Sequence, residues 1–322
     1  MKILIIGAGG MVGQKLVYKL LEPNFNAFNI DEICLFDLYL PKYKDTRIRR
    51  EIGTVENSAI LKKFSSERFS LIFYLASIVS GEAEENFEKG WNVNLFSMWN
   101  FLSALKVEHQ NSSRKYIPKV IFTSSIAVFG SPFPDKIDDE FLCSPQTSYG
   151  AQKASIEILI SDFSRKGFIN GISLRLPTIC VRPGKPNKAA SGFFSNIIRE
   201  PLNGKKAYLP VDPSVRHWHA SPRSAVNFLI HAVSLETFQL ENRRSLNLPG
   251  VSCTVEEQIE SLRSIAGQKA VDLIVPKKDL SIQNMVKGWP KNFSPLKASQ
   301  LGFKSENNFN EIIKVFIEDD LN

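Results

Sequence analysis

Short, mainly apolar runs alternate with longer segments of helical periodicity through the first half of the chain. Runs of this kind are typical of strands buried on both faces of a parallel sheet. The chain has five of them, over residues 2–6, 32–36, 70–75, 119–123 and 172–176. Their alternation with helical segments predicts one parallel sheet whose strands are joined by crossover helices.

The clearest helical pattern lies between the third and fourth runs. Its apolar residues are spaced by four, three, four and three positions, which places them on one helix face. They are Trp91, Leu95, Met98, Leu102 and Leu105. A second helix is predicted directly after the first strand, over Met11 to Leu21.

The sequence pattern changes after Leu176, where many prolines and glycines would interrupt a long helix or strand. Residues 245–248 resemble one more sheet strand, and Thr254 with Glu257 forms a capping box at the start of a following helix. We therefore expect one domain over residues 1–176, to which the chain returns over about 213–249. A smaller, loop-rich domain is expected mainly over 177–322.

Composition adds few constraints to this picture. The chain has 322 residues, of which 43% are hydrophobic and 23% charged, as in ordinary globular proteins. Its four cysteines are far apart and its four histidines lack ligand spacing, so we expect no metal and a cytoplasmic location. The net charge of +7 comes from dispersed lysines and arginines, which favours a solvated surface over nucleic-acid binding. The longest uncharged run is too short to span a membrane, and we expect no membrane partner.

A glycine-rich turn joins the first strand to the first helix. It reads Gly7-Ala-Gly-Gly10-Met11-Val12-Gly13. Glycines in this position let a phosphate approach the backbone, and the helix N-terminus supplies free N–H groups. The turn predicts dinucleotide binding and an α/β fold of the Rossmann type, with a doubly wound parallel sheet.

The residue that follows the second strand indicates which dinucleotide is bound. Asp37 lies where a carboxylate can accept hydrogen bonds from the adenosine ribose, and it would repel a 2′-phosphate. This predicts NAD as the cofactor. The alternatives are that Asp37 only caps a loop, or that Arg47, Arg49 and Arg50 hold the phosphate of NADP.

Tyr149 and Lys153 lie four residues apart in a segment predicted to be a helix from about Thr147, which places them on one face. A nearby ammonium group favours the phenolate, so Tyr149 could act as a base. Ser125 follows the fourth strand, where it could hydrogen-bond the reacting oxygen. Alone, this spacing is common in helix surfaces; the context of the sheet gives it weight.

Taken together, the order and spacing of these motifs resemble the extended short-chain dehydrogenase/reductase family, which includes sugar epimerases and dehydratases. The resemblance implies that Leu75, Ala76, Ser77 and Pro177 contact the cofactor and that Asn94 helps to hold the catalytic lysine. Thr54 departs from the family, which often has an aspartate at this position to contact adenine.

Two longer stretches, residues 78–84 and 182–193, resemble the D-erythronate dehydrogenase subgroup of that family. The subgroup oxidises the C2 hydroxyl of a four-carbon sugar acid, so the resemblance implies a small anionic sugar-acid substrate. Its contacts would then include Ser80, Ser191, Ser125 and Tyr149. We further expect Arg182, Arg216 or both to hold the carboxylate, with a domain-domain salt bridge as the alternative role for each.

Other functions remain possible on the sequence alone. A nucleotide-sugar epimerase or dehydratase would use the same tyrosine, although only Arg216 and His219 match that group's pattern in this region. A non-catalytic dinucleotide sensor usually loses the tyrosine or the lysine. His219 could contact substrate or form a structural hydrogen bond, and Cys180 is expected to pack. Trp91 and Trp99 are expected in the core or at a homodimer face.

Overall fold

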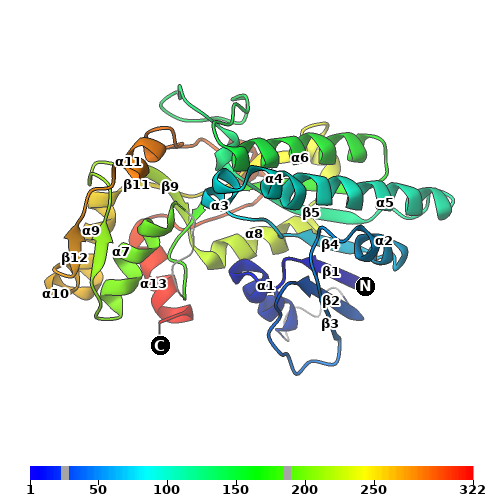
Figure 1. Cartoon of the computed structure of the whole chain (residues 1–322), viewed down its shortest axis with the longest axis horizontal. Coiled ribbons are helices and arrows are strands. Elements are labelled where there is room, and N and C mark those ends of the chain that lie inside the picture. The colour runs from blue at the N-terminus through cyan, green and yellow to red at the C-terminus, as the bar shows by residue number, and fades with distance from the viewer. Residues whose placement is uncertain (23–28, 185–189, 322) are drawn as a thin grey trace.

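The computed structural model describes residues 1–22, 29–184 and 190–321. A seven-stranded parallel sheet with the order β10-β6-β5-β4-β1-β2-β3 lies at the centre of the larger lobe (Figure 1). The strands are β1 (Lys2–Ile6), β2 (Glu32–Asp37), β3 (Ile48–Ile52), β4 (Leu71–Tyr74), β5 (Lys119–Ser125), β6 (Asn170–Leu176) and β10 (Ser245–Asn247). The six runs predicted as strands of a parallel sheet are confirmed.

The edge strand β3 was not predicted. Its sequence, Ile48-Arg-Arg-Glu-Ile52, is half polar, and all five residues are partly or fully exposed. Because this edge strand is not covered on both faces, it lacks the continuous apolar run that identifies the inner strands.

Helices cover both faces of the sheet (Figure 1). Ile3 and Ile5 of β1 pack in one core with α1 (Met11–Leu21) and α8 (Pro222–Ser234). The alternate residues Leu4 and Ile6 pack in a second core on the other face. That core is closed by α2 (Ser58–Ser66), α5 (Ser97–Asn111) and α6 (Ser148–Arg165). Because successive side chains of a strand point to opposite faces, the sheet is buried on both sides, as a doubly wound fold requires.

The helix that carries the predicted apolar stripe is not continuous. A short helix, α4 (Phe87–Gly90), leads into a π-helix, η2 (Trp91–Phe96), and only then into α5. The wider π-turn rotates the helix face, so Val93 and Asn94 are buried while Trp91 and Leu95 are only partly buried. Leu95 still packs on the core that Met98, Leu102 and Leu105 share, so the expectation of one apolar face holds from Leu95 onward and not at Trp91.

The smaller lobe has its own core and two small sheets. One sheet has the order β11-β9-β7, formed by β7 (Thr178–Ile179), β9 (Arg216–Ala220) and β11 (Val251–Thr254), and the other pairs β8 (Ala207–Leu209) with β12 (Ile274–Pro276). Its helices are α7 (Gly192–Leu202), α9 (Val255–Ala266), α10 (Gln268–Val271), α11 (Leu280–Lys287) and α13 (Phe309–Asp319), whereas α12 (Leu296–Gln300) packs on the core of the larger lobe. Both halves of the predicted capping box are formed at α9.

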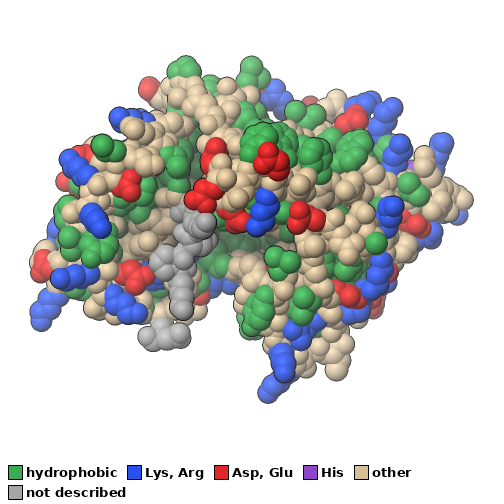
Figure 2. Space-filling model, in the orientation of Figure 1, with side chains coloured by type: hydrophobic (Ala, Val, Ile, Leu, Met, Phe, Trp, Pro, Cys, Tyr) green, Lys and Arg blue, Asp and Glu red, His purple; other side chains and the backbone are tan. Residues whose placement is uncertain are grey.

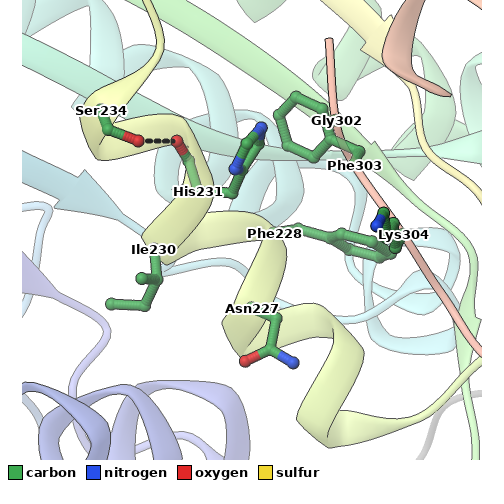
Figure 3. Close-up of a pocket in the computed structure, with 8 residues that line it drawn as sticks. All are labelled: Asn227, Phe228, Ile230, His231, Ser234, Gly302, Phe303 and Lys304. Carbon is green, nitrogen blue, oxygen red and sulfur yellow. Dashed lines mark hydrogen bonds between the residues drawn. The ribbon is translucent and has the colours of Figure 1, made fainter. Parts of the chain in front are cut away.

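The C-terminal segment is fastened to the larger lobe beside a surface pocket of about 380 Å³ (Figure 3). His231 of α8 shares a hydrogen bond of 2.7 Å with the Leu301 carbonyl, and its ring meets that of Phe303 edge to face. Gly302 between them has φ +90°, and an added Cβ would lie 3.2 Å from the His231 ring. Leu301, Gly302 and Phe303 therefore anchor this segment to α8.

Within the described ranges, no helix is both long and apolar enough to cross a membrane.

Candidate active site

The glycine-rich turn brings three backbone segments into direct contact. Gly7 has φ +93°, and a Cβ there would lie 2.4 Å from the Ala76 nitrogen in the turn after β4. At Gly13 a Cβ would lie 2.3 Å from the Gly7 carbonyl oxygen, so α1 could not pack so closely with any larger residue. Helix α1 begins at Met11, and no side chain caps its N-terminus. Its first N–H groups fit the pyrophosphate of a dinucleotide.

Asp37 ends β2 directly beside this turn. Its carboxylate accepts hydrogen bonds from the backbone N–H groups of Gly9, at 2.9 Å, and of Leu38, at 2.6 Å. The two bonds fix the carboxylate next to the mouth of the turn. Each carboxylate oxygen can accept a second hydrogen bond, so the group fits the hydroxyls of a ribose.

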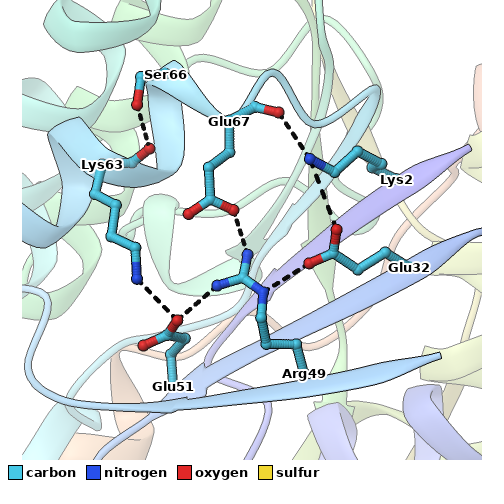
Figure 4. A network of polar contacts seen from close by, with 7 residues as sticks. All are labelled: Lys2, Glu32, Arg49, Glu51, Lys63, Ser66 and Glu67. Carbon is cyan, nitrogen blue, oxygen red and sulfur yellow. Dashed lines mark hydrogen bonds and ion pairs between the residues drawn. The ribbon is translucent and has the colours of Figure 1, made fainter. Parts of the chain in front are cut away.

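The arginines that could have held a 2′-phosphate are engaged by the protein itself. Arg47 pairs with Asp45 at 2.7 Å, and Arg50 donates to the Leu40 carbonyl at 2.7 Å. Arg49 is the centre of an ion-pair network with Glu32, Glu51 and Glu67, which Lys2 and Lys63 extend (Figure 4). None of the three arginines is left without a partner among the described residues.

Tyr149 lies in the first turn of α6, which Thr147 caps by accepting a hydrogen bond from the Gly150 N–H. Burial raises the pKa of the Tyr149 phenol. The positive charge of Arg182 opposes this rise in pKa, as do hydrogen bonds with Ser77 and Ser125. The structure therefore brings the predicted tyrosine, Ser125 and Arg182 together from β5, α6 and the segment after β7.

Lys153 lies one turn further along α6 and is 2% exposed. Its ammonium group donates to the Thr123 carbonyl at 2.8 Å and lies 5.5 Å from the centre of the Tyr149 ring. Burial lowers the pKa of Lys153 to about 7, and the charge of Glu157 acts in the opposite direction. An ammonium group can donate three hydrogen bonds, so Lys153 fits the additional task of binding cofactor hydroxyls.

Asn94 contacts the residue beside the lysine and not the lysine itself. Its amide nitrogen donates to Gln152 Oε1 at 2.7 Å, and its oxygen accepts from the Ile78 N–H at 2.9 Å and the Ser77 hydroxyl at 3.1 Å. Asn94 was expected to help to hold Lys153. In the structure its hydrogen bonds instead connect α6 with the turn after β4. The π-helix makes this bridge, because it turns Asn94 inward.

The two candidate carboxylate-binding arginines differ in their surroundings. Arg182 is partly buried, donates to the Ile179 carbonyl and the Ser191 hydroxyl at 2.9 Å each, and has no carboxylate partner among the described residues. Burial lowers its pKa. Arg216 instead pairs with Glu257 at 3.2 Å and is more than a third exposed. Of the two arginines, Arg182 is the one whose charge acts on Tyr149.

The remaining predicted residues have the following positions. Ser80 begins the short helix α3 (Ser80–Glu85), and Pro177 separates β6 from β7. His219 is fully buried and bonded to Gln258 at 2.9 Å. Burial holds the pKa of His219 well below its usual range and raises the pKa of Cys180 to about 12, so both serve as packed core residues. Residues 185–189, within the stretch 182–193, lie outside the described part of the chain.

Comparison with known proteins supports the same assignment. The pattern of the NAD dependent epimerase/dehydratase family matches residues 3–221. The D-erythronate dehydrogenase of Cupriavidus necator is 40% identical over 99% of this chain and 98% of its own length. That of Haemophilus influenzae is 41% identical over the full length of both chains.

The chain belongs to the NAD dependent epimerase/dehydratase family. Its cofactor is NAD, as Asp37 predicted, and it is an NAD-dependent dehydrogenase. Among solved structures, one described as a nucleoside-diphosphate-sugar epimerase from Agrobacterium tumefaciens has a TM-score of 0.95 and 49% identity, and the match covers 100% of this chain and 94% of that one. The resemblance and the Rossmann-type fold predicted from the sequence are thereby confirmed.

Sequence reasoning missed one charged residue in this member of the family. Glu157 is 3% exposed and pairs with Arg175 at 2.7 Å. A signal was available, because Glu157 follows Lys153 by four residues and so shares its buried helix face. A carboxylate on a buried face requires a partner, which only the fold could identify.

Proposed function

We propose that this dehydrogenase oxidises the C2 hydroxyl of a small sugar acid such as D-erythronate to the 2-oxo acid. The observation that carries the proposal is Arg182, a partly buried guanidinium beside Tyr149 that no carboxylate of the described chain neutralises. A substrate carboxylate next to the reacting carbon would supply the missing negative charge through two parallel hydrogen bonds. The curated relatives named D-erythronate dehydrogenase support the same substrate class.

Each side chain of the candidate active site has a separate role in this proposal. Arg182 holds the carboxylate, with Ser191 and Ser80 as neighbouring polar contacts, and thereby fixes the position of C2. Ser125 orients the hydroxyl, and Tyr149 accepts its proton. Lys153 stabilises the phenolate through its charge. Bound NAD supplies the acceptor for the hydride that leaves C2.

The cofactor would lie across the carboxyl ends of the central strands. Residues proposed to hold it are Gly7, Gly10, Met11, Val12, Gly13, Asp37, Leu75, Ala76, Ser77, Asn94, Tyr149, Lys153 and Pro177. In this scheme residues 1–176, with the return over 213–249, bind NAD, and residues 177–322 mainly bind substrate. Figure 2 shows the molecule hollowed between the lobe of β1–β3 and the lobe of α7 and α13.

A second candidate function is a nucleotide-sugar epimerase or dehydratase, which the Agrobacterium tumefaciens structure favours. Arg216, which resembles the arginine that contacts pyrophosphate in such enzymes, is paired with Glu257. That ion pair opposes pyrophosphate binding, because Glu257 already neutralises the positive charge of Arg216 that a pyrophosphate would need.

Release of NADH separates the two functions. The protein is incubated with NAD and a panel of four-, five- and six-carbon aldonic acids, with nucleotide sugars as the comparison. A sugar-acid dehydrogenase accumulates NADH in proportion to the acid consumed. An epimerase converts the nucleotide sugar without accumulating NADH, and that result would overturn the proposal.

We also propose a homodimer formed through α5 and α6. Three large hydrophobic side chains on these helices and the preceding turn are about half exposed or more: Phe96 at 51%, Trp99 at 47% and Ile158 at 71%. Figure 2 shows hydrophobic side chains gathered over this region. Their burial against a second copy would follow from the hydrophobic effect, and the measured mass in solution tests it.

A further inference from the structure

Glu157 occupies an unusual position for a carboxylate. It lies one turn beyond Lys153 on the buried face of α6 and is 3% exposed. Its oxygens accept a hydrogen bond from the Ser124 hydroxyl at 2.5 Å and hydrogen bonds from two nitrogens of Arg175 at 2.7 to 3.1 Å. Burying a carboxylate carries a large desolvation cost, so a site that retains one uses its charge or its geometry.

Successive turns of α6 face the carboxyl end of β5. Lys153 donates to the Thr123 carbonyl, and Glu157 accepts from the Ser124 hydroxyl. Ser125, the next residue of β5, acts to lower the pKa of Tyr149. The carboxylate and the ammonium group are therefore held at the same strand end, next to the serine of the candidate active site.

Few ionisable groups face Lys153. On its own helix these are Tyr149 and Glu157. Arg175 of β6 contacts Glu157, and Cys143 of the segment before α6 contacts Arg175. The aromatic ring of Phe122 on β5 covers the ammonium at 4.6 Å. Arg175 turns its remaining nitrogens toward Asn247 and Cys143. Among the described residues, Glu157 is the carboxylate whose charge acts on Lys153.

We propose that Glu157 is a positioning residue of this dehydrogenase, whose negative charge keeps the buried Lys153 in its ammonium form and thereby keeps Tyr149 ready to accept the substrate proton. The inference rests on the roles proposed above for Tyr149 and Lys153. Arg175 and Ser124 hold the carboxylate in place. Burial lowers the pKa of Lys153 to about 7 even with the charge of Glu157 acting against it, so loss of that charge would leave less of the ammonium form at neutral pH.

The test compares the pH dependence of kcat/KM in four variants: Glu157→Gln, Arg175→Met, the double variant Glu157→Gln/Arg175→Met and Glu157→Asp. The rising limb of the profile reports the ionisation of the base. Removing the Glu157 charge should shift this limb to higher pH by about half a unit or more, and lower kcat/KM at neutral pH by about threefold or more. The melting temperature is measured for each variant in parallel.

The double variant distinguishes charge from packing, because it removes a buried ion pair as a unit and leaves no unpaired charge. It should show the shifted limb, whereas Arg175→Met alone should not shift the limb upward. Glu157→Asp retains the charge and should retain the wild-type limb. If the double variant keeps the wild-type limb, or Arg175→Met shifts it as far upward as Glu157→Gln, the proposal is overturned.

Failure of the underlying function would look different. Wild-type protein that oxidises no sugar acid would remove the proposed function itself. A fully active Tyr149→Phe variant would remove the assignment of the base. Only the comparison among the Glu157 and Arg175 variants, in a wild-type background that is active, tests the inference.

Discussion

Two groups of cations in this molecule have opposite surroundings. At the β2–β3 edge, Arg49 is matched by Glu32, Glu51 and Glu67, and neighbouring lysines complete the network. At the candidate active site, Lys153 donates to a carbonyl of β5, and Arg182 donates to a carbonyl of β7 and to the Ser191 hydroxyl. Neither is paired directly with a carboxylate of the described chain.

The difference shows where ligand charge is expected. Desolvated cations without a counter-ion are costly for the folded protein, and that cost is recovered when an anion binds. In the Arg49 network, carboxylates of the protein already balance the positive charge, and the network stabilises a sheet edge. We propose that Lys153 and Arg182 bind cofactor and substrate, so substitutions in the two regions should affect different properties.

The largest effect is expected for Tyr149→Phe. It removes the proton acceptor but little contact area, so kcat should fall by at least ~10² while calorimetry shows nearly unchanged NAD binding. Tyr208→Phe, at an exposed tyrosine, is the matched control and should leave kcat and NAD binding unchanged. Near-normal turnover of a folded Tyr149→Phe protein would mean that another group is the base.

A smaller effect is expected when the guanidinium at the site is changed. Arg182→Lys keeps the charge but loses the planar pair of donors, so KM for the acid should rise about tenfold or more and KM for NAD should hardly change. Arg216→Lys serves as the control, since Glu257 already occupies that side chain. Equal rises in both variants would contradict the difference that the structure shows between the two arginines.

Asp37 should set the choice of cofactor. A 2′-phosphate would meet its carboxylate, so NAD should bind at least about tenfold more tightly than NADP. Asp37→Asn should narrow this ratio without altering KM for the acid. Equal affinities of wild-type protein for the two dinucleotides, measured by calorimetry, would disprove this role of Asp37.

The buried lysine should also appear in the pH dependence of stability. Its pKa is lowered to about 7 in the folded protein. Between that value and the ordinary pKa of lysine, the unfolded chain binds more protons, so this residue makes the free energy of unfolding rise with pH. Lys153→Met should flatten that rise in denaturant titrations. An unchanged slope would show that the folded protein accommodates the charged form of Lys153.

The smallest effect is expected at the matched network. Arg49→Met removes a partly exposed set of ion pairs, which should lower the free energy of unfolding by about 1 kcal/mol. Both KM values should stay at their wild-type levels. A kinetic effect of this variant comparable to that of Arg182→Lys would remove the distinction between the two regions.

The sequence sufficed for those features whose cause is local. Apolar runs identified the inner strands, and the glycine turn and Asp37 correctly predicted NAD. The spacing of Tyr149 and Lys153 correctly placed both on one helix. The edge strand β3 was not predicted because its side chains are partly polar and partly apolar. The π-helix at Trp91–Phe96 was not predicted because an argument from apolar spacing assumes a constant helical period.

Long-range pairing could not be predicted in the same way. Arg182 and Arg216 are equivalent in sequence terms, and only the fold shows that Glu257 reaches one and that Tyr149 faces the other. Glu157 of α6 pairs with Arg175, which lies 18 residues further along the chain on β6. Such partners depend on how α6 lies over β5 and β6, and no local pattern encodes that placement.

The most direct test of the account asks whether the site requires a substrate carboxylate. The rate kcat/KM is compared for D-erythronate and its uncharged amide, in wild-type protein and in Arg182→Lys. Wild-type protein should prefer the acid by at least about a hundredfold, and Arg182→Lys should lose most of that preference. If wild-type protein oxidises the amide as well as the acid, the unpaired Arg182 does not bind the substrate carboxylate and the central claim is wrong.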